Sequence, residues 1–501
     1  MAAVTVLAAG AAAASAAPAA GVCPPSSRPT TPVALGTAEW NGWGRDVDNN
    51  RYQPEPALRA ADVPKLAVKW AYAMAPADAY GQPTVVGGRV FVTSSAGWVY
   101  SLDARTGCTY WTFDAAAPVD TPIVVGELGK PVLIRPRWRR WHRQNAHIPV
   151  IEPPSALIFG DGSGNVYALD AERGTLLWKV AAGASMHGGV SGAPAVYDGR
   201  VYVLLTSAGF THGAVASLDL ATGALLWESP IPRSTADPAD GGAIAGTPTV
   251  DPRRASLYVA VGGAVVALDL TDGRPRWVAP VPPPNRPDPA DDPVTDTAAP
   301  AGNPPILQSL ADGRQVLLSA NAAGIAYALD PDRNGALLWQ AAVLRGTGGV
   351  EWAHASDHRD VYVAFADRSP QAGSDNAALA SLAIASGKVR WLKRASQPTC
   401  AVQGRRCAPA HAHALTVIPG IVFSGSIDGH LRAYSTIDGM AVWDYDTARS
   451  FQTINGGAVR GGSLGRDGPT VVDGIAYLES VDRGAGGATD GVLLAFSVDA
   501  K

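Results

Sequence analysis

The sequence repeats a glycine that is followed, four residues later, by a tryptophan. Seven such pairs occur, and successive tryptophans lie 49 to 67 residues apart. The pairs are Gly107/Trp111, Gly174/Trp178, Gly223/Trp227, Gly273/Trp277, Gly335/Trp339, Gly387/Trp391 and Gly439/Trp443. A short apolar stretch that often ends in Leu-Asp precedes each pair, as in VYALDAERGTLLW. A unit of this length, built from strands and tight turns, is typical of a radial array of small β-sheets.

Each repeat has the features of two strands joined by a turn. Val99, Ser101 and Asp103 alternate with Tyr100 and Leu102, which gives the first strand two distinct faces. In the turn that follows, the glycine supplies a positive φ. The tryptophan on the second strand is expected to lie across the neighbouring repeat and to bury apolar area between them. We therefore interpret these tryptophans as core residues.

Counting the repeats gives eight blades. Residues 492–498 (VLLAFSV) resemble the first strand of an eighth repeat, but the chain reaches Lys501 without another tryptophan. Near the other end of the chain, residues 66–70 (LAVKW) match the tryptophan strand alone. We predict an all-β, eight-bladed β-propeller whose last blade is closed by the N-terminal strand, because such closure removes exposed sheet edges.

The composition agrees with one large propeller. Only 17% of the 501 residues are charged, and 55 glycines and 40 prolines suit many short strands and turns. The net charge of −4 gives no reason to propose a nucleic-acid partner, and no apolar run in the body of the chain is long enough to span a membrane.

The N-terminal residues differ from the rest. Residues 1–22 are mostly Ala, Val, Leu and Gly, and Ala14-Ser15-Ala16 suits signal-peptidase cleavage. A basic segment is absent, so the true start could lie upstream. Val22 argues against lipid attachment at Cys23. We predict a signal segment at 1–22, a linker at 23–39, a propeller at 40–501, and a periplasmic or secreted location.

The four cysteines fit an oxidising compartment. Cys400 and Cys407 are close in sequence and are predicted to form one disulfide, which leaves Cys23 and Cys108 to pair by elimination. Four cysteines allow three connectivities, so the other two remain open. No cysteine lies in a Cys-x-x-Cys-His context, so covalent c-type haem is not expected.

The repeated Leu-Asp-x-x-x-Gly-x-x-x-Trp resembles the tryptophan-docking motif of the eight-bladed quinoprotein dehydrogenases, which bind pyrroloquinoline quinone (PQQ). Within that superfamily the chain is most similar to the polyvinyl-alcohol dehydrogenases, over residues 40–501. The segments that carry this likeness are 40–53 (WNGWGRDVDNNRYQ), 349–352 (GVEW), 417–425 (VIPGIVFSG), 426–434 (SIDGHLRAY), 444–449 (DYDTAR), 451–456 (FQTING) and 460–462 (RGG).

The resemblance implies a chemistry. In the family, PQQ lies in the central funnel, Ca²⁺ polarises the quinone and a carboxylate base removes the alcohol proton while a hydride passes to the quinone. Electrons then leave to a cytochrome c. The implied substrate is an alcohol, polymeric or secondary, and the implied cofactor is PQQ.

Several positions depart from the family pattern. Relatives carry a Ca²⁺-binding glutamate where this chain reads LLTSAGF at 204–210, and a ligand asparagine where it reads GGA at 262–264. The lysine near the quinone is also missing from the corresponding segment, 319–327. Because Ca²⁺ needs several oxygen ligands, these losses put its binding in doubt.

The resemblance also indicates candidate site residues. The catalytic aspartate of the family precedes a Pro-Pro-Ile-Leu segment, here 304–307, and Asp296 is chosen over Asp291 and Asp292; the alternative is that all three are solvated loop acids. The expected cofactor-binding residues are Glu351, Trp352, Asn455, Arg460, Gly461 and Gly462. Asn455 would bond a quinone or carboxylate oxygen and Arg460 a PQQ carboxylate. The alternative is a structural turn shared by the fold.

Two further features carry open alternatives. Residues 135–143 (RPRWRRWHR) would dock an acidic partner such as a cytochrome face, or form a solvated insertion loop. His411 and His413 would share one face of a strand as a metal pair, or be ordinary histidines. Two functions therefore stand: an exported PQQ-dependent alcohol dehydrogenase, or a decayed propeller that keeps its blades as a binding scaffold.

Overall fold

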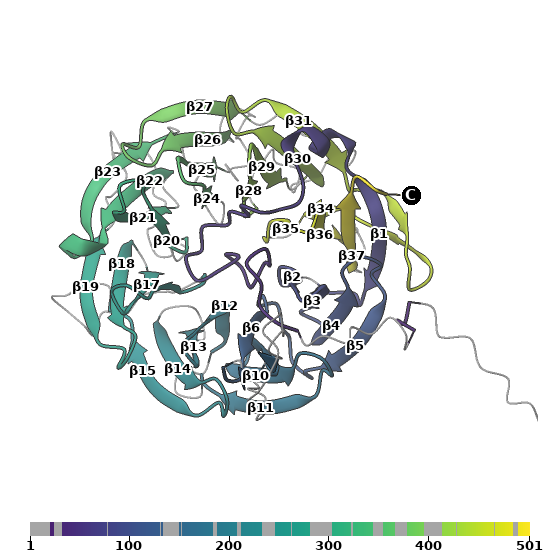
Figure 1. The fold of residues 1–501 in the computed structure, drawn as a ribbon, viewed down its shortest axis with the longest axis horizontal. Coiled ribbons are helices and arrows are strands. Elements are labelled where there is room, and N and C mark those ends of the chain that lie inside the picture. The colour runs from purple at the N-terminus through teal and green to yellow at the C-terminus, as the bar shows by residue number, and fades with distance from the viewer. Residues whose placement is uncertain are drawn as a thin grey trace, which may run out of the picture.

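The computed structural model is an eight-bladed β-propeller whose inner strands surround a central axis (Figure 1), and we call the region around this axis the channel. The described residues are 21–24, 33–77, 79–130, 132–133, 150–151, 153–183, 188–207, 212–232, 246–261, 263–280, 303–321, 324–343, 354–365, 378–394, 413–426, 428–464, 466–483 and 489–500. This arrangement confirms the predicted fold class.

Each blade is an antiparallel sheet whose strands follow one another from the channel to the rim. Blades 1 to 4 comprise β2 (Thr84–Val86), β3 (Arg89–Thr93), β4 (Trp98–Asp103) and β5 (Thr109–Asp114); β6 (Val124–Glu127), β9 (Ser155–Gly160), β10 (Asn165–Asp170) and β11 (Leu176–Ala181); β12 (Val190–Tyr197), β13 (Arg200–Thr206), β14 (Gly213–Asp219) and β15 (Leu225–Pro230); and β16 (Thr249–Asp251), β17 (Ser256–Val261), β18 (Ala264–Asp269) and β19 (Pro275–Pro280).

The second half of the propeller is built in the same way. Blades 5 to 7 comprise β20 (Ile306–Ser309), β21 (Gln315–Ala320), β22 (Ile325–Asp330) and β23 (Ala336–Ala342); β24 (His354–Ser356), β25 (Asp360–Phe365), β26 (Ala378–Ala383) and β27 (Val389–Arg394); and β28 (Thr416–Ile418), β29 (Ile421–Gly425), β30 (His430–Ser435) and β31 (Ala441–Asp446). Two small hairpins lie outside the blades: β7 (Val132–Leu133) pairs with β8 (Val150–Ile151), and β32 (Ser450–Gln452) pairs with β33 (Ala458–Arg460). Two 3-10 helices are also present, η2 (Ala60–Lys65) and η3 (Pro331–Arg333).

Blade 8 joins the two ends of the chain. It contains β35 (Thr470–Val472), β36 (Ile475–Arg483) and β37 (Thr489–Ser497), and its outermost strand is β1 (Ala67–Met74) from the N-terminal side. β1 runs antiparallel to β37, with Ala71 opposite Leu494. A short strand, β34 (Ser463–Leu464), also pairs with β36. The predicted closure by the N-terminal strand is confirmed.

The repeated tryptophans dock one blade on the next. The glycines of the repeat have φ between +68° and +75°, and each lies under the indole of the preceding blade. In blade 7, Gly439 lies beneath Trp391, whose Nε1 donates a hydrogen bond of 2.9 Å to the carbonyl of Thr436. Trp70 of β1 covers Gly107 of blade 1 and continues the pattern across the closure. The tryptophans therefore pack between repeats as predicted, but only Trp178 and Trp277 are buried core residues. The other five are half-buried at the edge of the core, namely Trp111, Trp227, Trp339, Trp391 and Trp443.

Replacing Gly439 by alanine should lower the free energy of unfolding by about 2 kcal/mol, because the new Cβ adds the cost of a left-handed φ to an overlap with an indole. An added Cβ would lie 2.6 Å from the ring of Trp391. The matched control is Gly199→Ala, which has φ +72° but no atom within 4 Å of the added Cβ. Urea denaturation would measure both, and equal losses would contradict the docking role.

A disulfide lies near the closure. Cys23 is bonded to Cys108, as predicted, and the main chain of Gly21 and Cys23 pairs with Thr109 at the outer edge of blade 1. The hairpin β32–β33 lies beside it, because Gly21 contacts Asn455. Cys400 and Cys407 lie outside the described residues, and their disulfide stays a prediction.

A segment that we call the plug, residues 40–56, crosses the channel and contacts the inner strands. Its main chain bonds β2, β16, β20, β24 and β28, as in the pair of hydrogen bonds of 2.9 and 3.0 Å between Trp40 and Val85. The amide side chains of Asn41 and Gln53 bond β6 and β35. Figure 1 shows this purple segment inside the ring of blades. The plug divides the channel into two ends.

The two ends of the channel differ in what borders them. The first and third turns of each blade, such as residues 86–89 and 103–107, lie at what we call the hairpin end. The second turns and the connections between blades lie at the opposite, connection end. Residues 33–39 lie at the hairpin end, because Val33 contacts Gly87 and accepts a hydrogen bond of 2.6 Å from Ser155.

Candidate functional site

Arg51 of the plug lies in the centre of the channel. Its side chain is completely buried and donates hydrogen bonds to the carbonyls of Trp43 and Leu415 and to Gln82 and Thr416. The guanidinium also lies 4.5 Å from the ring centroid of Trp43. One side chain therefore connects the plug to blades 1 and 7 and forms the floor of the connection end.

The charge of Arg51 is compensated from the connection end. Burial lowers the pKa of Arg51 to about 9, and the field of Asp467 partly opposes that change. Asp467 precedes the inner strand of blade 8, and desolvation raises its pKa despite the nearby charges of Arg466 and Arg51. Asp467 therefore lies near the buried cation Arg51, and its carboxyl group keeps its proton to a higher pH than an exposed aspartate does.

Residues that immediately precede or begin the inner strands form a ring around the connection end. These positions carry the buried polar side chains Gln82, Thr121, Thr247, Asn303, His354 and His413. Asn303 Nδ2 donates 3.0 Å to the carbonyl of Ala320. Burial lowers the pKa of His354 to about 4, against the opposing effect of a hydrogen bond with the main chain of Pro304. The imidazole is therefore neutral near pH 7.

The sequence contains a signal for this ring that the repeat analysis does not use. A proline lies one or two residues before five of the inner strands, at positions 83, 122, 248, 304, 305 and 469. Gln82, Thr121, Thr247 and Asn303 each precede one of these prolines, but no common motif joins them. Inner-strand hydroxyls also connect neighbouring blades: Thr470 Oγ1 donates 2.7 Å to Pro83 O, and Thr84 Oγ1 donates 2.5 Å to Ile123 O.

A second carboxyl group, Glu479 of β36, lies buried near Asp467. Its side chain is 5% exposed, and Oε1 has no hydrogen-bond partner among the described residues. Desolvation and the charge of Asp467 raise the pKa of Glu479 well above its usual value. Two carboxyl groups whose pKa values are both raised can hold and release protons at the edge of the channel.

Replacing Glu479 by glutamine should raise the free energy of unfolding at neutral pH by about 1 to 3 kcal/mol, because the amide cannot ionise and so avoids the cost of a buried, unpaired charge. Because its folded pKa is raised, the native state binds more protons than the unfolded state above pH 4.5, and this destabilisation grows as pH rises from there. Urea denaturation at pH 4 and pH 8 would test this. The variant should match the parent protein at pH 4, and an equal gain at both pH values would contradict the titration.

Asn455, expected at the cofactor, lies at the outer rim. Its Oδ1 accepts 2.9 Å from the amide of Ala73, and its Nδ2 donates 2.8 Å to the carbonyl of the same residue. Ala73 belongs to β1, the outermost strand of blade 8. Any contact of this side chain with a quinone would require both bonds to break.

Arg460, Gly461 and Gly462 lie together on the connection between blades 7 and 8. Arg460 is half-exposed, and its Nε is 3.6 Å from Asp482. Gly461 and Gly462 pass closely over β36, and the amide of Gly462 donates a hydrogen bond of 2.8 Å to Ser480 Oγ. A Cβ on Gly462 would lie 2.6 Å from the carbonyl of Val481. The structure therefore uses these glycines for close packing.

Other predicted site residues fall outside the described residues. They are Asp291, Asp292, Asp296, Glu351, Trp352, His411 and the arginine-rich segment 135–143. His413 is described: it is buried, and its Nε2 contacts the carbonyl of Leu464. In the segment 204–210, where the resemblance implies a glutamate in relatives, Leu204 and Leu205 are buried in β13 and residues 208–210 lie outside the described residues.

Within the described ranges, no group of three or more His, Cys, Asp or Glu side chains could hold a metal ion. Arg466 lies at the mouth of the connection end. Its side chain is half-exposed, and its Nη2 lies 3.3 Å from the carboxylate of Asp120 near the start of blade 2. Among the same residues, no helical segment has the length and apolar character that a membrane crossing requires.

Comparison with known proteins matches both the repeats and the site segment. A family model described as outer membrane protein assembly factor BamB matches residues 135–301 and 322–493, and one described as the β-propeller domain of glucose/ethanol/alcohol dehydrogenases matches 40–178. Among solved structures, the quinohemoprotein alcohol dehydrogenase of Comamonas testosteroni aligns with a TM-score of 0.66 over 93% of this chain and 82% of its own, at 18% identity, which concerns the fold alone.

Two sequence relatives cover nearly the whole propeller. A polyvinylalcohol dehydrogenase of Pseudomonas sp. is 36% identical over 463 residues, which is 83% of this chain and 69% of that protein. A polyvinylalcohol dehydrogenase of Sphingopyxis sp. is 34% identical over 483 residues, 85% of this chain and 69% of that protein. The chain therefore belongs to the quinoprotein β-propeller family that contains the polyvinylalcohol dehydrogenases.

Proposed function

We propose that the protein is an exported oxidoreductase that oxidises an alcohol, polymeric or secondary, with PQQ bound at the connection end of the channel. The observation that carries this proposal is the 36% identity to a polyvinylalcohol dehydrogenase across 83% of the chain. The family segment 40–53 forms the floor of the channel, where Arg51 and Trp43 pack together. The disulfide between Cys23 and Cys108 supports a periplasmic or secreted location.

The described residues fit PQQ better than they fit calcium. PQQ carries carboxylates, and Arg466 at the mouth offers a guanidinium that is half-exposed and so can pair with one of them. Arg460 remains a second proposed partner on the neighbouring connection. Calcium takes six to eight oxygen ligands, and the glutamate and asparagine ligands that the resemblance implies have no counterpart in residues 204–210 and 262–264. We therefore do not include Ca²⁺ among the proposed cofactors.

When bound, PQQ supplies a two-electron acceptor for the alcohol carbon. The chain must then bind the substrate and accept its hydroxyl proton. Asp296 stays the proposed base on resemblance. Asp467 and Glu479 are proposed to take up the proton next, because both have raised pKa values and lie on blade 8 beside the channel floor. A cytochrome c is the proposed electron acceptor, by resemblance.

The second candidate function is a binding scaffold without cofactor. The segments 204–210 and 262–264 favour it, since the resemblance implies calcium ligands there and neither segment carries a carboxylate or an asparagine. The scaffold would use the same channel without redox chemistry. The two candidates differ in one measurable property, which is the binding of PQQ.

The deciding experiment titrates the protein with PQQ, with and without Ca²⁺, and follows quinone absorbance and dye-linked oxidation of polyvinyl alcohol. We expect saturable PQQ binding, weakened about tenfold or more in Arg466→Ala through loss of a charge-assisted hydrogen bond. Arg59→Ala on the exposed turn η2 is the control and should bind as the parent does. Absence of binding at micromolar PQQ would reject the enzyme, and binding without turnover would identify a decayed site.

A further inference from the structure

Among the described residues, the plug forms hydrogen bonds with every inner strand except β12 of blade 3. Asn41 bonds β6 of blade 2 through its side chain, and the carbonyl of Val47 accepts 3.0 Å from Val250 of blade 4. Between them, residues 42–46 form a loop closed by a hydrogen bond of 2.9 Å from Asn41 to Arg45. In the described chain, no hydrogen bond connects the plug to β12 of blade 3.

The unpaired groups of β12 belong to Val196. In blade 1, Val85 lies opposite Val90 of β3 and exchanges both main-chain hydrogen bonds with Trp40 of the plug. Val196 lies opposite Val201 of β13 in the same register, one residue before the same kind of two-residue turn. Its N–H and C=O therefore face the channel as those of Val85 do. Neither group has a partner among the described residues, and Val196 is half-buried beside a cavity, so both groups are open to a ligand.

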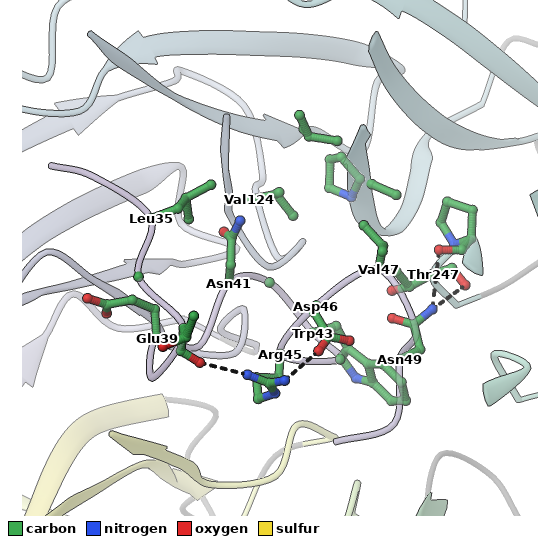
Figure 2. A pocket seen from close by; sticks show the side chains of 18 residues that line it. Leu35, Glu39, Asn41, Trp43, Arg45, Asp46, Val47, Asn49, Val124 and Thr247 are labelled. Carbon is green, nitrogen blue, oxygen red and sulfur yellow. Dashed lines mark hydrogen bonds and ion pairs between the residues drawn. The ribbon is translucent and has the colours of Figure 1, made fainter. Parts of the chain in front are cut away.

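A cavity of about 390 Å³ lies beside this strand, between β12 and the plug. Figure 2 shows Leu35, Val124 and Val47 along its apolar wall, with the charged groups of Glu39, Arg45 and Asp46 on the other side. Leu35 is 40% exposed, so the cavity opens at the hairpin end. This volume is within the range of ligand pockets in proteins.

Local structure holds the plug and β12 apart. Gly160 and Gly126 let β12 approach blade 2 closely: an added Cβ on Gly126 would lie 3.1 Å from Val196, and one on Gly160 would overlap Val190. On the other side, Arg45 adopts φ +79°, a costly conformation for a residue with a side chain. Its guanidinium bonds the carbonyl of Thr37 at 3.1 Å and Asp46 at 2.7 Å.

We propose that this cavity binds an extended peptide segment, which completes the inner-strand pairing of blade 3. The other inner strands show what satisfies such an edge, namely a chain with its own N–H and C=O groups. One wall of the cavity carries Glu39 and the ion pair of Arg45 with Asp46, which is two carboxyl groups and one guanidinium, so a neutral or cationic peptide is favoured over an anionic one. The apolar wall takes a small aliphatic side chain. The cavity opens at the hairpin end and reaches Trp43 and Thr247 at its inner end, and peptide binding there requires no PQQ.

The test uses the blocked tripeptide acetyl-Ala-Val-Ala-amide and the intact protein. Binding should slow hydrogen exchange of the Val196 amide, and an analogue with a methylated valine nitrogen should bind roughly tenfold more weakly, because pairing hydrogen bonds are lost. Leu35→Trp should block the cavity and weaken binding. Leu226→Trp is the control, because Leu226 is similarly exposed but lies on the outer strand β15, and this substitution should not change binding.

Three results would overturn the proposal. The first is no change in exchange at about 10 mM peptide, where even a millimolar complex is populated. The second is equal binding of the methylated analogue, which would show that main-chain pairing is not used. The third is an amide of Val196 that is already protected from exchange without peptide. None of these results bears on PQQ binding at the opposite end of the channel.

Discussion

Replacing Arg51 by methionine should lower the free energy of unfolding by about 3 to 5 kcal/mol, the cost of removing one partner from a buried charged network. Methionine keeps much of the aliphatic volume but donates no hydrogen bond. The carbonyls of Trp43 and Leu415 and the amide oxygen of Gln82 would each lose a donor inside the channel. The indole of Trp43 would also lose the cation above it.

Urea denaturation followed by tryptophan fluorescence would measure the loss. Arg59→Met is the matched control, because Arg59 also carries an ion pair, 2.6 Å from Asp62, but its side chain is 83% exposed. Exposed pairs of this kind contribute little, so this variant should unfold with the parent protein. A loss below about 1 kcal/mol in Arg51→Met would show that water or a rearranged plug satisfies the same acceptors.

The role of Arg51 marks the limit of what the sequence could predict. The segment 40–53 is recognisable by resemblance, yet its partners Gln82 and Leu415 lie 31 and 364 residues away. No local period or spacing joins them. The blades were predictable for the opposite reason. Each Gly-x-x-x-Trp pair records a packing rule that recurs between neighbouring repeats, so the count of blades and the closure by β1 follow from the chain itself.

The candidate site was harder to predict because its residues do not repeat. His354 and Asn303 begin or precede inner strands of adjacent blades, but they have different chemical types and neighbours. Asn455 shows the converse. It lies in a segment that resembles the family, and its amide nevertheless bonds the outer strand β1. A segment that resembles the family therefore indicates that the local structure is shared. It does not by itself indicate that a ligand contact is shared.

Removing the disulfide between Cys23 and Cys108 should lower the free energy of unfolding by about 4 kcal/mol, the chain-entropy value for a loop of this size. The bridge joins residues 85 positions apart. The loop that it closes contains the plug, β1 and most of blade 1, which are the elements that complete the ring of blades. In the unfolded chain the bridge keeps these elements close together, so its loss makes closure more costly.

The Cys23→Ser, Cys108→Ser double variant would be compared with the parent protein by urea denaturation, with and without a reducing agent. The parent should lose stability on reduction, and the double variant should not respond to reduction at this site. Cys400→Ser, Cys407→Ser is the comparison variant: the predicted bridge there closes a short loop and should contribute less, because loop entropy grows with length. Equal stability of the reduced and oxidised parent would show that the plug and the docking tryptophans hold blades 8 and 1 together without the bridge.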